Sequence, residues 1–304
     1  MSDYAVKAED FRKQAEKKLK SVFGGMFGGS SKYEDAAELL EKAANNYKLA
    51  KMGAEAAEMY EKLAGCYLKM DSKHEAASSY VEAAKVISKV DPGRSQHMLR
   101  QAVTLYTDMG KLNMAAKQLK EIAEQMEKQG QKDEAIQYYT QAGDLFEMEG
   151  SNSEATKCKL KIAEFSAEAG RYSKAVELFE DAARRAVENN LLKYSARGYL
   201  LQAGICCLAY LRPDDVVKKL DKYRGIDLQF DGSREANLLD GLVEARRELD
   251  ESKFATLLAE FDAITRLDPW KVKILREAKK KIEEEALGVG EGGGDEEEDE
   301  DELL

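Results

Sequence analysis

The chain has 304 residues, with 58 acidic and 47 basic side chains, which gives a net charge of −11. Nine of the acids lie in the last fifteen residues, so the rest of the chain carries only −2 and a nucleic-acid partner is not expected. The chain has no run of eighteen apolar residues, which excludes a membrane-spanning helix. It has only three prolines and no alternating β-branched pattern, which favours an all-α protein.

The first predicted helix covers residues 3–20 and is rich in lysine, and a glycine-rich stretch follows it. Four large side chains in that stretch form what we call the apolar loop: Val22, Phe23, Met26 and Phe27. Two interpretations stay open for the apolar loop. Its side chains either fold back onto the first repeat or dip into a bilayer while neighbouring lysines meet anionic head groups. A phosphate-binding loop is rejected, because no lysine directly follows the glycines and no strand precedes them.

Alanine pairs, or an alanine with another small or apolar residue, recur about every twenty residues in the next segment. They begin at Ala36, Ala56, Ala76, Ala115, Ala135, Ala155 and Ala175. Around them, apolar residues are spaced by three, four and seven, which is one face of an α-helix. Forty residues therefore make one helical hairpin, and the segment is predicted to be a tetratricopeptide-like α-solenoid.

The twenty-residue rhythm ends after Arg212-Pro213. Less regular helices are expected near residues 214–223, 233–249, 252–267 and 269–286, and we interpret them as a C-terminal helical bundle. The remaining residues are mostly glycine and acid, which predicts a disordered tail. The predicted organisation is an N-terminal helix with the apolar loop over 1–31, helical-hairpin repeats over 32–211, the C-terminal helical bundle over 212–287 and the acidic tail over 288–304.

Three basic residues, Lys117, Lys157 and Arg197, lie forty residues apart, one in each successive hairpin. Equivalent positions of successive hairpins face the same side of a solenoid, so we expect these three to form a basic stripe. The alternative is that they are ordinary solvated cations in a chain that is 35% charged. A stripe of this kind suits a rod-shaped acidic partner such as a helical bundle.

No pattern typical of catalysis, metal binding or cofactor binding is present, so the chain is predicted not to be an enzyme and to need no cofactor. His74 and His97 lie in different repeats without a paired ligand motif. The four cysteines lack CxxC spacing and are expected to be reduced packing residues. The first residues also lack the apolar core of a signal peptide, which favours a cytoplasmic location.

Several segments, taken together in chain order, resemble the alpha-type soluble NSF attachment proteins. They are MFGGSSK at 26–32, SKHEAA at 72–77, YTDMG at 106–110, LLKYSA at 191–196, EFD at 260–262 and RLD at 266–268. The resemblance spans nearly the whole chain. It implies an adaptor that binds the four-helix SNARE complex and recruits and stimulates the AAA+ ATPase NSF, so that SNAREs are disassembled in vesicle transport and membrane fusion.

The resemblance also implies site residues. The implied SNARE-facing residues are Lys89, Lys111, Lys117, Lys157, Lys161, Lys193 and Arg197. The implied NSF-contacting residues are Glu244 and Glu248 in the bundle and Leu303 or Leu304 at the end of the chain. The apolar loop would touch membrane lipids and make the protein peripheral on membranes. The alternative function is a generic tetratricopeptide scaffold that binds peptide tails, for which no clustered Lys/Asn clamp is found.

Overall fold

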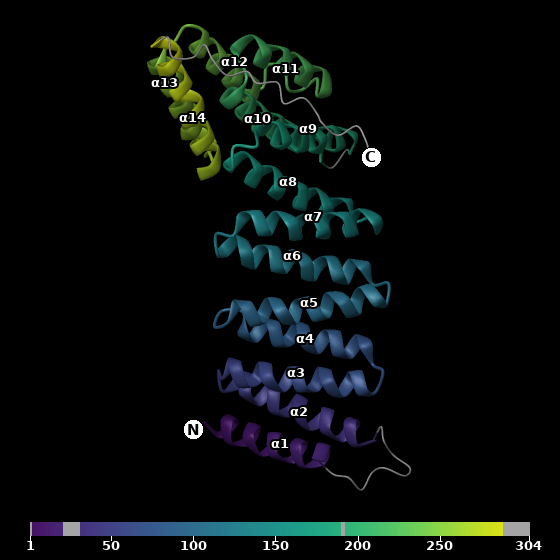
Figure 1. Cartoon of the computed structure of the whole chain (residues 1–304). Helices are drawn as coiled ribbons and strands as arrows, with labels where there is room; N and C mark the ends of the chain where they lie inside the picture. The colour runs from purple at the N-terminus through teal and green to yellow at the C-terminus, as the bar shows by residue number, and fades with distance from the viewer. Residues whose placement is uncertain (1, 21–30, 190–191, 288–304) are drawn as a thin grey trace, which may run out of the picture. The chain divides into compact units, whose positions relative to one another are not determined.

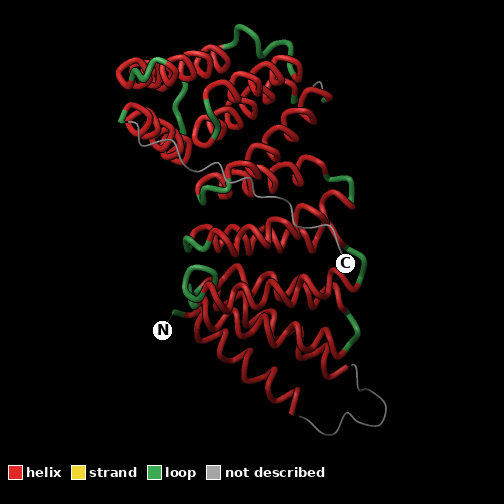
Figure 2. Tube along the Cα trace, turned by 45° about the horizontal axis from the view of Figure 1, so that its top comes forward, coloured by secondary structure: helices red, strands yellow, loops and turns green. Residues whose placement is uncertain are grey.

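The computed structural model describes residues 2–20, 31–189 and 192–287. These residues form fourteen α-helices and no strand (Figures 1 and 2). In chain order the helices are α1 (Asp3–Lys20), α2 (Ser31–Leu49), α3 (Gly53–Lys69), α4 (Lys73–Ile87), α5 (Pro92–Asp108), α6 (Leu112–Lys128), α7 (Lys132–Met148), α8 (Asn152–Glu168), α9 (Tyr172–Glu188), α10 (Lys193–Tyr210), α11 (Pro213–Ile226), α12 (Arg234–Arg247), α13 (Glu251–Ile264) and α14 (Pro269–Ala286). The predicted fold class, an all-α solenoid of helical hairpins with further C-terminal helices, is confirmed.

The helices divide into two compact units, which cover Met1–Cys158 and Lys159–Leu304. In the first unit, consecutive helices pack side by side from α1 to α7. The first alanine of every pair in this unit is fully buried: Ala36, Ala56, Ala76, Ala115, Ala135 and Ala155. Small side chains at these positions let the helix backbones approach each other, which is why the alanine rhythm predicts the stacking.

Helix α5 breaks the alanine rhythm. Ser95 and Gln96 stand where the other helices carry the alanine pair, and both are buried. The Ser95 hydroxyl donates to the Ala84 carbonyl at 3.0 Å and accepts a bond from the Gln125 side-chain amide at 3.1 Å. Hydrogen bonds across α4, α5 and α6 therefore satisfy the buried serine, whereas the Gln96 side-chain nitrogen is buried without a partner.

The N-terminal helix α1 packs against α2 as the first helix of the array. Ala5, Ala8 and Ala15 are its buried residues. The Tyr47 hydroxyl of α2 donates to a Glu9 carboxylate oxygen at 2.9 Å. The expected helix over residues 3–20 is confirmed to its ends, and it belongs to the same packing as the repeats.

From α2 to α9, six of the turns between consecutive helices use a left-handed residue at the end of the preceding helix, and the turn between α4 and α5 does not. Gly110 and Gly130 take φ values of 67° and 77°, which a glycine adopts without strain. The same turn is made by Lys51 at φ 59° and Asp71 at φ 57°, where a side chain costs conformational energy. Lys51 and Asp71 lie twenty residues apart, as do Gly110 and Gly130, which is the helix-plus-turn length expected from the sequence.

In the second unit, α10 lies at the centre of the core. It contacts α9, α11, α12 and α14, and its buried residues run through all its faces from Leu200 to Ala209. A helix that is apolar all round can be stable only when neighbours enclose it. Cys206 and Cys207 lie here, and all four cysteines of the chain are free and buried, as expected. Burial raises the pKa of the Cys158 and Cys207 thiols to about 11, so they are poor nucleophiles.

Three predicted helix ends in this unit are wrong by a few residues. Helix α11 ends at Ile226 rather than 223. Helix α12 ends at Arg247 rather than 249, because Leu249 takes φ 53° and turns the chain. Helix α13 ends at Ile264 rather than 267, because Asp262 accepts a bond from the Leu267 backbone N–H at 2.7 Å. Side-chain bonds of this kind compete with helical backbone bonds and end the helix.

Candidate functional site

Lys117 and Lys157 of the basic stripe lie in the first unit, and Lys120 and Glu154 lie between them. Lys117 of α6 is exposed, and it has no ion pair with any residue that the structure describes. Three residues further along α6, Lys120 bonds a Glu154 oxygen of α8 at 2.8 Å. Lys157 bonds the other Glu154 oxygen at 2.6 Å. Lys117 and Lys157 therefore belong to one charged surface that joins α6 to α8.

Glu154 is the electrostatic centre of that surface. Hydrogen bonds from Lys120 and Lys157 hold its pKa at about 2, although partial burial opposes ionisation. The carboxylate is therefore charged throughout the neutral range. The Lys157 side chain stays 59% exposed while it makes this bond, so its ammonium can still meet an acidic partner.

The remaining stripe residue lies in the second unit. Arg197 is half-buried on α10 and has no ion pair among the described residues. One helical turn earlier, Lys193 begins α10 and lies 5.4 Å from the centre of the Tyr194 ring. Lys161 of α8 pairs with Glu164 at 3.4 Å and lies over the Phe165 ring.

The other two expected basic residues, Lys89 and Lys111, lie in turns. Lys89 follows α4, and Lys111 is the residue just before α6. These turns lie at opposite ends of the seventeen-residue helix α5, which spans about 25 Å at 1.5 Å per residue. Both side chains are exposed, but the structure does not bring them together into one cluster.

The two acids expected to contact NSF lie at the C-terminal end of α12. Glu244 is 51% exposed at its side chain and lies 3.8 Å from Arg247. Glu248 is 48% exposed and bonds Lys253 at 2.6 Å. Each acid has a cation beside it, but about half of each side chain remains open to a partner.

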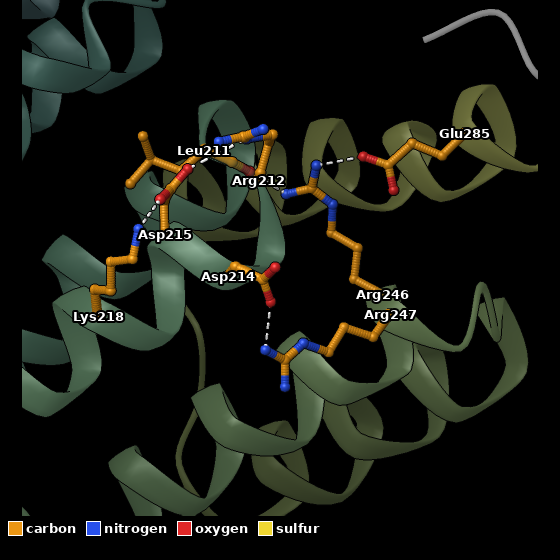
Figure 3. Close-up of polar contacts among 8 residues, drawn as sticks. All are labelled: Leu211, Arg212, Asp214, Asp215, Lys218, Arg246, Arg247 and Glu285. Atoms are coloured by element: carbon orange, nitrogen blue, oxygen red, sulfur yellow. Dashed lines mark hydrogen bonds and ion pairs between the residues drawn. The ribbon is translucent and has the colours of Figure 1, made fainter. Parts of the chain in front are cut away.

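The neighbouring arginines of α12 point in different directions (Figure 3). Arg246 is 2% exposed and donates to the Leu208 and Leu211 carbonyls at the end of α10, at 2.9 and 2.6 Å. It also bonds Glu285 of α14. Arg247 instead bonds Asp214 at the start of α11. Sequence reasoning missed the role of Arg246, because a charged residue beside exposed acids gives no sign of burial.

A buried cluster of hydrogen bonds around Glu180 joins α9 to α11. Glu180 is only 3% exposed, and its carboxylate accepts bonds from Lys222 at 2.6 Å, Lys219 at 3.0 Å and the Tyr223 hydroxyl at 3.1 Å. Burial opposes ionisation of Glu180, but the bonds from Lys222 and Lys219 outweigh it and lower the pKa. A buried charge with this many partners stabilises the arrangement of the two helices.

Several expected site residues lie outside the described residues: Val22, Phe23, Met26, Phe27, Leu303 and Leu304. In the described part of the chain, no helix is both long enough and apolar enough to cross a membrane. Over the same residues, no cluster of three or more His, Cys, Asp or Glu side chains is placed to hold a metal ion.

Comparison with known proteins gives one consistent family. A family model described as soluble NSF attachment protein, SNAP, matches residues 6–283. The alpha-soluble NSF attachment protein of Vitis vinifera is 41% identical and covers 94% of this chain and 98% of its own length. The protein of the same name from Dictyostelium discoideum is 44% identical, with 93% and 98% covered. A probable vesicular-fusion protein sec17 homolog of Schizosaccharomyces pombe is 35% identical, with 91% and 96% covered.

Proposed function

The chain belongs to the soluble NSF attachment protein family, and from this premise we propose that it is the adaptor that joins NSF to assembled SNARE complexes for their disassembly in vesicular fusion. The observation that carries the proposal is the family match over residues 6–283. The chain is an adaptor and not an enzyme, so the energy for disassembly comes from ATP hydrolysis by NSF. A generic scaffold for peptide tails is not favoured, because the family match accounts for nearly the whole chain.

The SNARE-binding surface is assigned to the basic residues. Lys117 supports this assignment because it is exposed and has no ion pair in the described structure, so no internal bond must break when it meets an acidic helix. Lys157 supports it because more than half of its side chain is exposed despite its bond to Glu154. Exposed ion pairs are individually weak, so we assign the affinity to the set of cations acting together.

The test is a pull-down in which an immobilised SNARE complex captures NSF through this chain. The wild-type chain should retain NSF, and Lys117→Glu with Lys157→Glu should retain little of either protein at low salt. Circular dichroism should show that the double variant keeps its helices, because both positions are exposed at least in part. Retention of NSF by the double variant at the wild-type level would refute the assigned surface, and failure of the wild type would refute the adaptor function.

Membrane contact and NSF stimulation are assigned to the two segments outside the described residues. The apolar loop is proposed to insert into the bilayer, because large apolar side chains next to lysine-rich α1 suit an anionic surface. The protein would then be cytoplasmic and peripheral on membranes. Leu303 and Leu304 are proposed to stimulate NSF together with Glu244 and Glu248, because they are the only large apolar side chains after Val289.

A further inference from the structure

Helix α13 is rich in apolar residues but buries few of them. Only Phe254 and Phe261 are buried. Ala255 and Ala259, one helical turn apart, are exposed, and Leu258 beside them is half-buried. Apolar helix faces of this kind on a soluble protein mark a surface that another segment covers.

A groove lies beside this face, between α13 and α14. Its cavity of about 340 Å³ is lined by Ala255, Leu258 and Ala259 of α13 and by Leu267, Val272 and Leu275. Val272 is 40% exposed. The groove can therefore receive an aliphatic side chain without displacing a buried one.

The edge of the groove is basic on its α14 side. Arg276 and Lys279 of α14 line it, whereas the acid on the α13 side, Asp262, is paired with Arg266 and accepts a bond from the Leu267 N–H. Lys279 bonds Glu251 at 3.1 Å, whereas Arg276 is exposed and makes no ion pair within the described residues. Between residues 271 and 281, six side chains are basic and one is acidic. An occupant of this groove should therefore combine an aliphatic side chain with flanking carboxylates.

The tail of this chain, residues 288–304, has that composition. It carries nine acids and ends with Leu303-Leu304. Seventeen residues follow Leu287 and can span up to about 55–60 Å, whereas Leu275 of the groove lies twelve residues before Leu287, about 18 Å back along α14. The tail is thus long enough to turn back, and its attachment gives a high effective concentration at the groove.

We propose that the tail docks on the α13–α14 groove of its own chain, with Leu303 or Leu304 in the groove and the carboxylates along Arg276 and its basic neighbours. The inference rests on the proposed function, in which the same leucines stimulate NSF. The docked tail is withheld from NSF, and NSF must compete for it. Docking therefore sets how much of the adaptor is ready to stimulate the ATPase.

The test follows hydrogen–deuterium exchange of the α13 amides in the full-length chain, together with ATP hydrolysis by NSF. Leu303→Ser with Leu304→Ser should raise exchange in α13 about threefold or more, because the docked tail no longer covers it. This variant changes no residue of α13 or α14. Val272→Glu should raise α13 exchange by a similar factor, because a carboxylate in the groove repels the acidic tail. Val90→Glu is the matched control, since Val90 is an exposed valine of the first unit.

The ATPase readout separates docking from the role of the leucines at NSF. Val272→Glu should reach half-maximal stimulation at a lower adaptor concentration than wild type, because its tail is free, whereas the leucine variant should stimulate less. If α13 exchange is the same in the leucine variant and wild type, docking is refuted and the proposed function stands. If the leucine variant raises exchange but stimulates NSF fully, docking stands and the leucines' role at NSF fails. Protection of α13 that grows with chain concentration, or appears only with NSF, would identify another occupant and overturn the proposal.

Discussion

Replacing Glu154 by glutamine should tighten binding to an acidic partner, although it removes two ion pairs from the adaptor. Glu154 holds Lys120 at 2.8 Å and Lys157 at 2.6 Å, so the carboxylate competes with the partner for both ammonium groups. Partly exposed pairs of this kind contribute about 0.2–1 kcal/mol each. If the substitution removes this competition and binding becomes more favourable by about 1 kcal/mol, the dissociation constant for the partner falls about fivefold.

The assay is titration of a fixed SNARE complex with the full-length adaptor at low and at physiological salt. The gain should be larger at low salt, because it arises from exposed charges. Asp215→Asn is a suitable control, since Asp215 also bonds two cations, Arg212 and Lys218, but lies on α11. An unchanged or weaker affinity of Glu154→Gln, with its helices intact, would refute the competition that we infer.

The pH dependence of stability gives an independent check on Glu154. Its pKa is about 2 in the folded chain, against an ordinary value of 4.5. A carboxyl with a lowered folded pKa contributes stability above the unfolded value, and that contribution is lost as the pH falls from about 4.5 towards 2. The free energy of unfolding of Glu154→Gln should therefore fall less steeply than that of wild type over this interval, as measured by urea titration at several pH values.

Five further outcomes are expected. Replacing both phenylalanines and the methionine of the apolar loop by serine should slow disassembly of SNARE complexes anchored in liposomes and spare soluble ones, and equal slowing would refute a lipid contact. Deletion of Leu303 and Leu304 should preserve SNARE binding and lower NSF ATPase stimulation at saturating adaptor, and equal hydrolysis rates would contradict it. In thermal unfolding, Gly204→Ala should destabilise by about 1–3 kcal/mol, because the new Cβ would lie 2.4 Å from a Leu239 methyl; Gly198→Ala, with open space around it, should stabilise α10 by up to about 1 kcal/mol. Glu180→Gln should cost about 1–3 kcal/mol of unfolding free energy at neutral pH, and a loss below 0.5 kcal/mol, about the scatter of surface substitutions, would refute its role in holding α9 to α11.

The repeat architecture could be predicted because it depends on spacing. Ala36, Ala56 and Ala76 recur at intervals of one helix plus one turn, and each is fully buried. The spacing of the alanines indicates where each helix and turn begins, and the small residues indicate where neighbouring helices are in contact. Ser95 could not be placed by the same rule, because a polar residue is buried only where hydrogen bonds from other helices satisfy it.

The candidate site was predictable only in part. The forty-residue register selects Lys117 and Lys157, but it says nothing of Lys120, whose bond to Glu154 depends on how α6 packs near α8. Arg246 shows the same limit more clearly. Its guanidinium is buried against the carbonyls that end α10, and no local pattern around residue 246 indicates that those carbonyls lie within reach.

The most direct test of the adaptor function is ATP-driven disassembly of a purified SNARE complex by NSF, measured with and without this chain. We expect disassembly only when the chain is present, at a rate that rises with its concentration and then saturates. The Lys117→Glu, Lys157→Glu variant should give little disassembly at the same concentrations. Disassembly at equal rates with and without the chain, or none in either case with an NSF that a known attachment protein activates, would contradict the function proposed for it.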